Sequence, residues 1–250
     1  MTGMMARLAW SALSLVLFAA VWHAVAALLG SRLLPGPAEV GAALLGLARG
    51  GALLRNIGVT LARVLASFAV AMLVGSAIGV ALGRSRALNR LFDAWLVLFL
   101  NLPALVVIIL CYVWFGLNEA AAVTAVAVNK IPNVAVTLRE GARALDRDLA
   151  EMAAVYRFGA WKSLRHVVLP QLAPFFAAAA RSGLALVWKI VLVVELLGRS
   201  NGVGFELQTA FQLFDVSAIL AYALAFTAVV QAIELGVLQP VERAANRWRR

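Results

Sequence analysis

Six long apolar runs divide this 250-residue chain and restrict it to folds that are buried in lipid. They lie at residues 8–29, 57–82, 91–115, 120–138, 173–197 and 218–238. A helix rises about 1.5 Å per residue, so a run of about 20 residues crosses the roughly 30 Å of hydrocarbon in a bilayer. The sequence therefore predicts an all-α, polytopic membrane protein in which residues 1–250 form one domain with six transmembrane helices.

The composition indicates a membrane protein and not a nucleic-acid-binding protein. Apolar residues make up 64% of the chain and charged residues 14%, whereas a soluble domain has roughly 45–50% and about 25%. The net charge of +10 would also suit a nucleic-acid-binding protein. However, the basic residues fall mostly between the apolar runs and form no patch with aromatic residues. We therefore expect membrane lipid as a partner and no nucleic acid.

The distribution of Lys and Arg predicts how the spans are oriented. With both termini inside, the inner segments hold one, three, six and four basic residues in chain order, fourteen in all, against four in the outer segments. Because basic residues gather on the cytoplasmic side, we expect a multi-pass protein of the bacterial inner membrane with both termini in the cytoplasm. The first run is longer than the apolar core of a signal peptide, about 7–15 residues, so we expect it to be retained.

Little in the sequence could carry catalysis or metal binding. The chain has one cysteine, Cys111, and two histidines, His23 and His166, which lie far apart. This leaves neither a disulfide framework nor a metal-binding pair, and the chain lacks a G-x-x-x-x-G-K-[ST] phosphate-binding loop. We expect no catalytic residue, no metal and no cofactor in this chain. An intramembrane enzyme, which would need paired catalytic groups on facing spans, is therefore not favoured.

Three glycines mark a position of close helix packing in the second run. Gly75, Gly79 and Gly83 recur at every fourth residue, so they share one stripe of a helix on which another backbone can approach closely. Two partners remain open at this point, namely another helix of the same chain or a second copy of the chain.

The longest inner segment, residues 139–171, has the pattern of two short amphipathic helices. Asp148 and Glu151 form a D-x-x-E capping box, which predicts that a helix starts at Asp148. Gly159 is expected to end or bend that helix, and Pro170 to stop a second short apolar stripe. Such a pair suits either a docking element for another protein or a helix pair on the membrane surface.

The same segment resembles a known family signature. Glu151-Met152-Ala153, followed by Leu169-Pro170, resembles the EAA signature of the membrane subunits of bacterial ATP-binding-cassette importers. Met152 replaces the first alanine of that signature, and Arg157 stands where the family usually has glycine, with Gly159 two residues later. Three further segments are similar to the nitrate, sulfonate and taurine branch: Leu34-Pro35-Gly36-Pro37, Trp114-Phe115-Gly116, and Glu195 with Gly198, Gly202 and Gly204.

The resemblance implies the permease subunit of an ATP-driven importer, which works by alternating access on a small anionic solute of sulfonate, taurine, nitrate or bicarbonate type. It implies three protein partners: a separate ATPase subunit that binds and hydrolyses ATP, a periplasmic or extracellular solute-binding protein, and a second permease copy in a homodimer. The residues implied at the ATPase contact are Glu151, Met152, Ala153, Tyr156, Gly159, Leu169 and Pro170.

Ionisable residues inside the spans are the remaining candidates for function. Lys130, Lys189 and Glu195 lie in the predicted spans, where a charge costs about 2.5–3.5 kcal/mol to insert. Either they line the pathway, where the lysines favour an anion, or a lysine forms a structural ion pair with Glu195 across helices. Arg63 is expected to extend outward to the headgroups. An ion-coupled secondary transporter is the alternative function, but it needs buried carboxylates, and the spans hold few of them, with Glu195 and Glu234 toward the ends of their spans.

Overall fold

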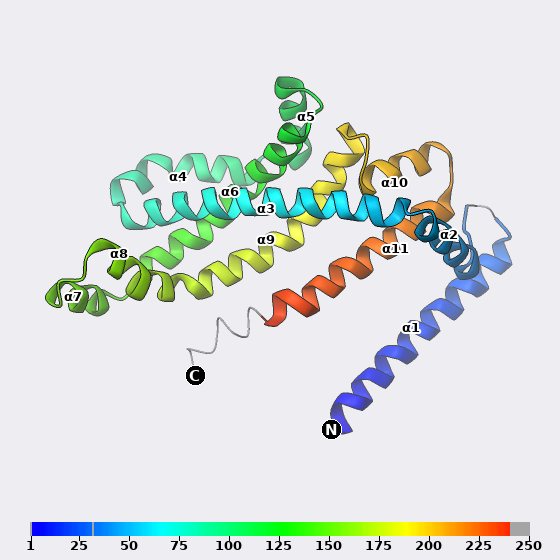
Figure 1. The fold of residues 1–250 in the computed structure, drawn as a ribbon, viewed down its shortest axis with the longest axis horizontal. Helices are drawn as coiled ribbons and strands as arrows, with labels where there is room; N and C mark the ends of the chain where they lie inside the picture. The colour runs from blue at the N-terminus through cyan, green and yellow to red at the C-terminus, as the bar shows by residue number, and fades with distance from the viewer. Residues whose placement is uncertain (1, 32, 241–250) are drawn as a thin grey trace.

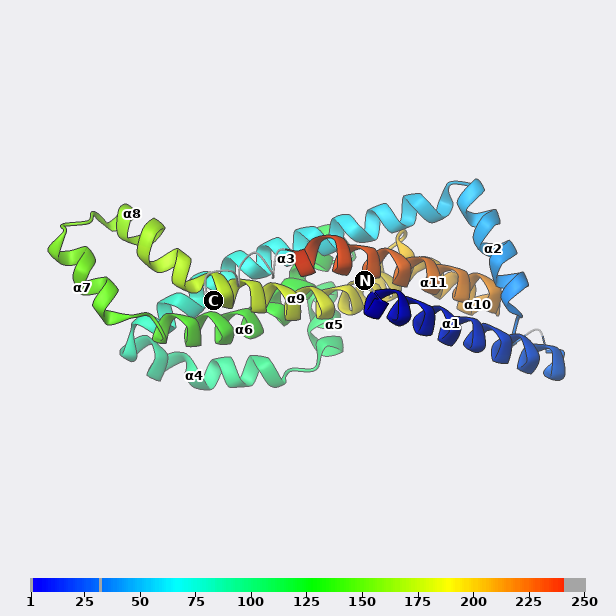
Figure 2. The same ribbon diagram turned by 90° about the horizontal axis from the view of Figure 1, so that it is seen from below.

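The computed structural model describes residues 2–31 and 33–240, and within that range it contains helices and no strand. Their order and bounds are α1 (Thr2–Leu29), α2 (Pro37–Arg49), α3 (Ala52–Arg84), α4 (Arg86–Asn101), α5 (Ala104–Phe115), α6 (Glu119–Arg143), α7 (Arg147–Val155), α8 (Ala160–Ser163), the π-helical turn η1 (Leu164–Val168), α9 (Leu169–Gly198), α10 (Val203–Gln212), α11 (Val216–Ile233) and the π-helical turn η2 (Glu234–Leu238). Figure 1 shows an elongated bundle with α7 and α8 at one end and α2 and α10 at the other. In the view turned by 90°, α7 and α8 again project beyond the other helices (Figure 2).

The centre of the bundle is built from α3, α6 and α9, which pack against one another along their lengths. The glycine stripe of α3 faces α6, because a Cβ atom on Gly75 would lie 2.7 Å from Cβ of Val134, and one on Gly83 would lie 2.6 Å from Cβ of Ala142. The stripe therefore serves packing within one chain, which was one of the two partners left open by the sequence.

Membrane-spanning helices are confirmed, but the third predicted span is not one straight helix. Residues 91–115 fall in α4 and α5, which meet at an angle of 97°. Leu102 is extended there, with φ −67° and ψ 128°, because a residue before proline disfavours helical geometry, and Pro103 has no N–H group to continue the helix. The described residues thus hold five long apolar helices, or six spans if the bent pair crosses as one.

Residues 139–171 contain the first of the two expected short helices, α7, but the second does not stop at Pro170, because α8, η1 and α9 continue as one helix over Ala160–Gly198. The π-helical turn η1 leads directly into the first turn of α9, where Pro170 lies, so the proline is accommodated there. Both predicted boundaries of the first helix were also wrong. Asp146, and not Asp148, is the N-cap residue, and its Oδ1 accepts a hydrogen bond of 2.8 Å from the backbone N–H of Asp148. Two aspartates are close enough in sequence to cap this helix, and the cap is formed by the earlier one, Asp146. The helix already ends at Val155, and Gly159 is instead the residue that precedes α8.

The charges counted for orientation are only partly within the described residues. Arg32 and the four arginines of the C-terminal segment, Arg243, Arg247, Arg249 and Arg250, lie outside them. The arginines that follow α3 and α6 are described, and they lie at the α7 end of the bundle (Figure 1).

Candidate functional site

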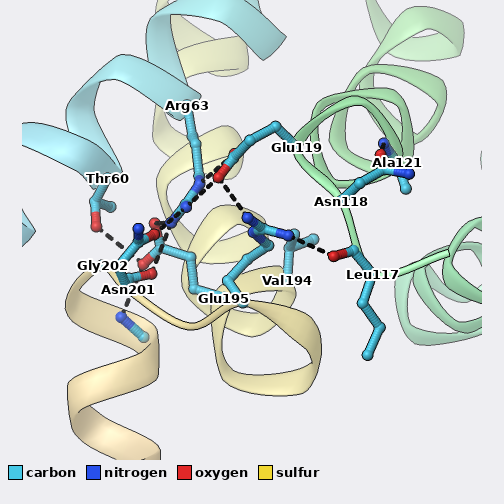
Figure 3. A network of polar contacts seen from close by, with 12 residues as sticks. Thr60, Arg63, Leu117, Asn118, Glu119, Ala121, Val194, Glu195, Asn201 and Gly202 are labelled. Carbon is cyan, nitrogen blue, oxygen red and sulfur yellow. Dashed lines mark hydrogen bonds and ion pairs between the residues drawn. The ribbon is translucent and has the colours of Figure 1, made fainter.

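A network of charged side chains joins α3, α6 and the turn between α9 and α10 (Figure 3). Arg63 is at its centre, and its side chain is 5% exposed. Its Nη1 atom donates to Oε1 of Glu195 at 2.7 Å, and its Nε and Nη2 atoms donate to the two carboxylate oxygens of Glu119 at 2.8 and 2.7 Å. Nη2 also donates to the side chain of Asn201. The expectation that Arg63 extends outward to the headgroups was therefore wrong.

Glu195 is fully buried, and both of its carboxylate oxygens have partners. Oε1 accepts from Arg63, while Oε2 accepts from Oγ1 of Thr60 at 2.9 Å and from the backbone N–H of Gly204 at 2.8 Å. Its ion pair is thus with Arg63, and the proposed structural pair of Glu195 with Lys130 or Lys189 is not formed. A buried carboxylate needs this number of donors, because an unpaired one would be strongly destabilising.

The glycines that follow Glu195 are required by the geometry of this network. Gly202 has φ 104°, and a Cβ atom there would lie 2.5 Å from the Oε atoms of Glu195. A Cβ atom on Gly204 would lie 2.7 Å from Cβ of Glu195, and one on Gly198 would lie 2.5 Å from the ring of Tyr112. The spaced Glu and Gly residues seen in the sequence therefore form one folded unit that closes the α9–α10 turn.

The two intramembrane lysines lie in different environments. Lys130 on α6 is 2% exposed, and its stem lies against α9, since a Cβ atom on Gly183 would be 3.0 Å from Cε of Lys130. Within the described residues its ammonium has no hydrogen-bond or ion-pair partner. Lys189 on α9 is exposed, as are Ser182 and Leu186 on the same helix face. The sequence could not separate the two, because both lie near the middle of an apolar run.

The exposed side of α7 and its C-cap residue carry three of the seven residues expected at an ATPase contact. Glu151 and Met152 are exposed, and Tyr156 is 71% exposed. Ala153 is 4% exposed and faces the interior of the helical hairpin instead. The exposed apolar side chains at this end favour a protein contact over a solvent-facing surface.

The turn after α7 has the hydrogen bonds of a Schellman motif. The backbone N–H of Phe158 donates to the carbonyl of Ala153 at 2.8 Å, and that of Arg157 donates to Ala154 at 3.0 Å. Arg157 lies between them with φ 48°, in the left-handed region that favours glycine. Arg157, which stands where the signature resembled by this segment has glycine, therefore adopts a conformation that favours glycine.

The remaining residues expected at the ATPase contact lie after α7 in the chain. Gly159 is exposed just before α8, and Leu169 and Pro170 are exposed in the first turn of α9. The structure therefore groups Glu151, Met152, Tyr156 and Gly159 on α7 and the turn after it, whereas α8 and η1 separate Leu169 and Pro170 from that turn. Sequence reasoning missed the partners of Glu195, because Arg63 lies 132 positions away.

Comparisons with known proteins show the family to which the chain is similar. The family described as binding-protein-dependent transport system inner membrane component matches residues 71–237. The chain is 28% identical over 231 residues to the aliphatic sulfonates transport permease protein SsuC of Escherichia coli (strain K12), which covers 92% of this chain and 88% of that protein. It is 25% identical over 244 residues to the taurine transport system permease protein TauC of the same strain, with 94% and 88% covered.

A relative that matches over a shorter stretch and a solved structure extend the comparison. The bicarbonate transport system permease protein CmpB of Synechococcus elongatus is 27% identical over 162 residues, which are 64% of this chain and 58% of that protein. A chain from the crystal structure of an amino acid ABC transporter with histidines superposes with a TM-score of 0.61 at 20% identity, covering 80% of this chain and 97% of that one. The latter likeness concerns the fold.

Proposed function

The chain belongs to the family of binding-protein-dependent transport system inner membrane components, and from that premise we propose that it imports a small anionic solute of sulfonate, taurine, nitrate or bicarbonate type. It is a multi-pass inner-membrane permease subunit of an ATP-binding-cassette importer and not an enzyme, since ATP hydrolysis in this family belongs to a separate subunit. Its partners are that ATPase subunit and a solute-binding protein.

Lys189 is the observation that supports an anionic solute. Its side chain is exposed on α9, inside the longest apolar segment of the described chain. An ammonium group that faced hydrocarbon there would cost about 2.5–3.5 kcal/mol, so this face of α9 is expected to line a water-filled path. A cation in such a path raises the local concentration of anions. The relatives above are named for sulfonates, taurine and bicarbonate, all of which carry an acidic group.

A homodimer would complete that path. In this proposal the exposed face of α9 in one copy meets the corresponding face of the second copy, and lipid surrounds both. Lys130 lies one layer deeper, between α6 and α9, where its charge would act on the path from behind. Both termini and the α7 end would lie in the cytoplasm, ATP would be bound only by the ATPase subunit, and this chain would hold no cofactor.

Coupling to the ATPase would depend on the exposed end of α7. Glu151, Met152 and Tyr156 would contact the ATPase, while buried Ala153 would hold α7 against the rest of the loop. Gly159, Leu169 and Pro170 would shape the base of the contact. We expect Glu151→Arg to abolish uptake and to prevent co-purification of the ATPase while the chain still inserts in the membrane. Asp148→Arg, which makes the same charge change one turn earlier, is the matched control and should retain co-purification.

The solute class is tested by uptake into proteoliposomes that contain the chain, its ATPase subunit and the solute-binding protein. Lys189→Ala should lower the initial rate of labelled anion uptake about tenfold, and Lys189→Arg should keep most of it, because the charge is retained. Arg49→Gln removes one positive charge outside the path and should leave the rate unchanged. Unchanged uptake in both Lys189→Ala and Lys130→Ala would contradict the anion proposal.

The ion-coupled alternative has lost its main candidate residue. A coupling carboxylate must exchange its proton or cation, but both oxygens of Glu195 are held by Arg63, Thr60 and Gly204. Uptake in the same proteoliposomes should therefore stop when ATP is replaced by a non-hydrolysable analogue. Continued uptake under an ion gradient alone would reject the importer proposal.

A further inference from the structure

A polar cavity lies at the α7 end of the bundle, apart from the exposed face of α7. Its volume is about 640 Å³. The end of α3, the start of α4, the α6–α7 turn and the start of α9 all contribute to its wall. None of the residues expected at the ATPase contact lines this cavity, so the cavity is separate from that expected contact.

Arginines converge on this cavity from four helices, namely α3, α4, α6 and α7. The wall includes Arg84, Arg86, Arg90, Arg143 and Arg147. Arg143 pairs with Glu140 at 3.0 Å, whereas the other four have no ion-pair partner within residues 2–31 and 33–240. Like charges at such short range repel one another, so an anion in the cavity would stabilise this end of the protein.

The single acidic residue in the wall, Asp146, offsets at most one of the positive charges of these arginines. Its Oδ1 atom accepts the hydrogen bond from the backbone N–H of Asp148 that caps α7, and its own N–H donates to Oε1 of Gln171 at 2.8 Å. The cavity therefore keeps a large excess of positive charge and offers guanidinium donors, which match the oxygens of a phosphate.

The position of the cavity favours a phosphate group that is attached to a lipid. Arg84 is the last residue of the spanning helix α3, so the cavity lies where the headgroups of the inner leaflet would be. A second cavity of about 480 Å³, lined only by apolar residues that include Phe92 and Trp95, adjoins it, and Leu82 lines both. A molecule with an anionic head and apolar chains fits this pair of cavities, as basic pockets on the cytoplasmic side do for anionic lipids.

We infer that the basic cavity binds a phosphate-bearing anion, and that this anion is the headgroup of an anionic phospholipid of the inner leaflet. The inference rests on the cavity and its arginines and does not depend on the solute proposed above. The bound headgroup would tie the end of α3 and the start of α4 to the α6–α7 turn, next to the coupling loop.

The test uses the purified full chain in mixed micelles titrated with dioleoylphosphatidylglycerol or dioleoylphosphatidylcholine, with bound lipid counted by native mass spectrometry. The anionic lipid should bind about tenfold more tightly than the zwitterionic one. Arg86→Gln/Arg90→Gln should remove most of that preference. Arg49→Gln/Arg55→Gln makes the same charge change at the opposite end of α3 and should leave the preference intact.

Three results would go against the inference in distinguishable ways. Equal affinity for both lipids, or equal loss in both double variants, would overturn the site. Binding of inorganic phosphate alone, with no lipid preference, would keep the phosphate chemistry but overturn the lipid as its source. Loss of ATPase co-purification from Arg86→Gln/Arg90→Gln without a change in lipid binding would assign the arginines to an acidic surface of the ATPase.

Discussion

Arg157 is a residue with a bulky side chain held in the left-handed region, in the turn that follows α7. A side chain in the left-handed region costs roughly 1–2 kcal/mol, because its Cβ atom approaches the following carbonyl oxygen. The hydrogen bonds from Phe158 to Ala153 and from Arg157 to Ala154 hold it there. The sequence showed an arginine at this position but could not show its left-handed conformation, since that depends on these backbone hydrogen bonds.

A glycine at position 157 should stabilise the turn that follows α7. Arg157→Gly removes the Cβ strain, and we expect it to raise the free energy of unfolding by about 1 kcal/mol after the extra freedom of glycine in the unfolded chain is included. The measurement is the midpoint of thermal denaturation in detergent. Arg157→Ala removes the same charge but keeps the Cβ atom, so it should give no comparable gain. A lower midpoint for Arg157→Gly would contradict the strain at this position.

The buried charge network allows two arginines to be compared. Arg63→Met should destabilise the chain by about 3–5 kcal/mol, because it leaves the fully buried carboxylate of Glu195 without its ion-pair partner. Arg199→Met also removes a partner of Glu119, but that carboxylate is 55% exposed, so the cost should be at most about 1 kcal/mol. Thermal denaturation of both variants measures the difference. Equal destabilisation would show that burial of Glu195 does not dominate.

At the scale of helices, apolar runs predicted the spans well but not their internal geometry. The run at residues 91–115 is continuous in hydropathy, so it reads as one span, although Pro103 bends it by 97° into α4 and α5. Hydropathy reports the transfer of side chains into lipid, while the bend depends on backbone donors that hydropathy does not contain. The same reasoning applies to α7, where two aspartates could cap the helix and only the backbone geometry decides between them.

The glycine stripe of α3 gives a prediction for helix packing. Gly79→Ala would place a Cβ atom 2.9 Å from Cβ of Leu138 and against the backbone of Ala135, so we expect a loss of about 1–3 kcal/mol from overpacking. Gly58→Ala changes the same residue type in the same helix, where no atom lies within 4 Å of the added Cβ. It should be neutral or slightly stabilising, since alanine favours a helix. Both are measured by thermal denaturation, and equal effects would reject close packing at Gly79.

At the scale of the whole molecule, three features follow one another along the bundle: the α7 end with its arginines, the lysines on α6 and α9, and the charge network at the α9–α10 turn. The order follows from the sequence, because apolar runs and basic loops fix which segments share a side of the membrane. The contacts cannot be read from the sequence. Arg63, Glu119 and Glu195 come from distant parts of the chain and meet only when α3, α6 and α9 pack together.

The orientation of the bundle can be tested with the single cysteine of the chain. Cys111 is buried, and in a Cys111→Ala background Trp161→Cys and Leu213→Cys place thiols on residues that are 71% and 73% exposed at opposite ends of the bundle. With the α7 end in the cytoplasm, a membrane-impermeant maleimide should label Leu213→Cys in intact spheroplasts and Trp161→Cys only after lysis. A permeant maleimide should label both and serves as the control. The reverse pattern would invert the bundle, and the basic cavity could then no longer face the inner leaflet.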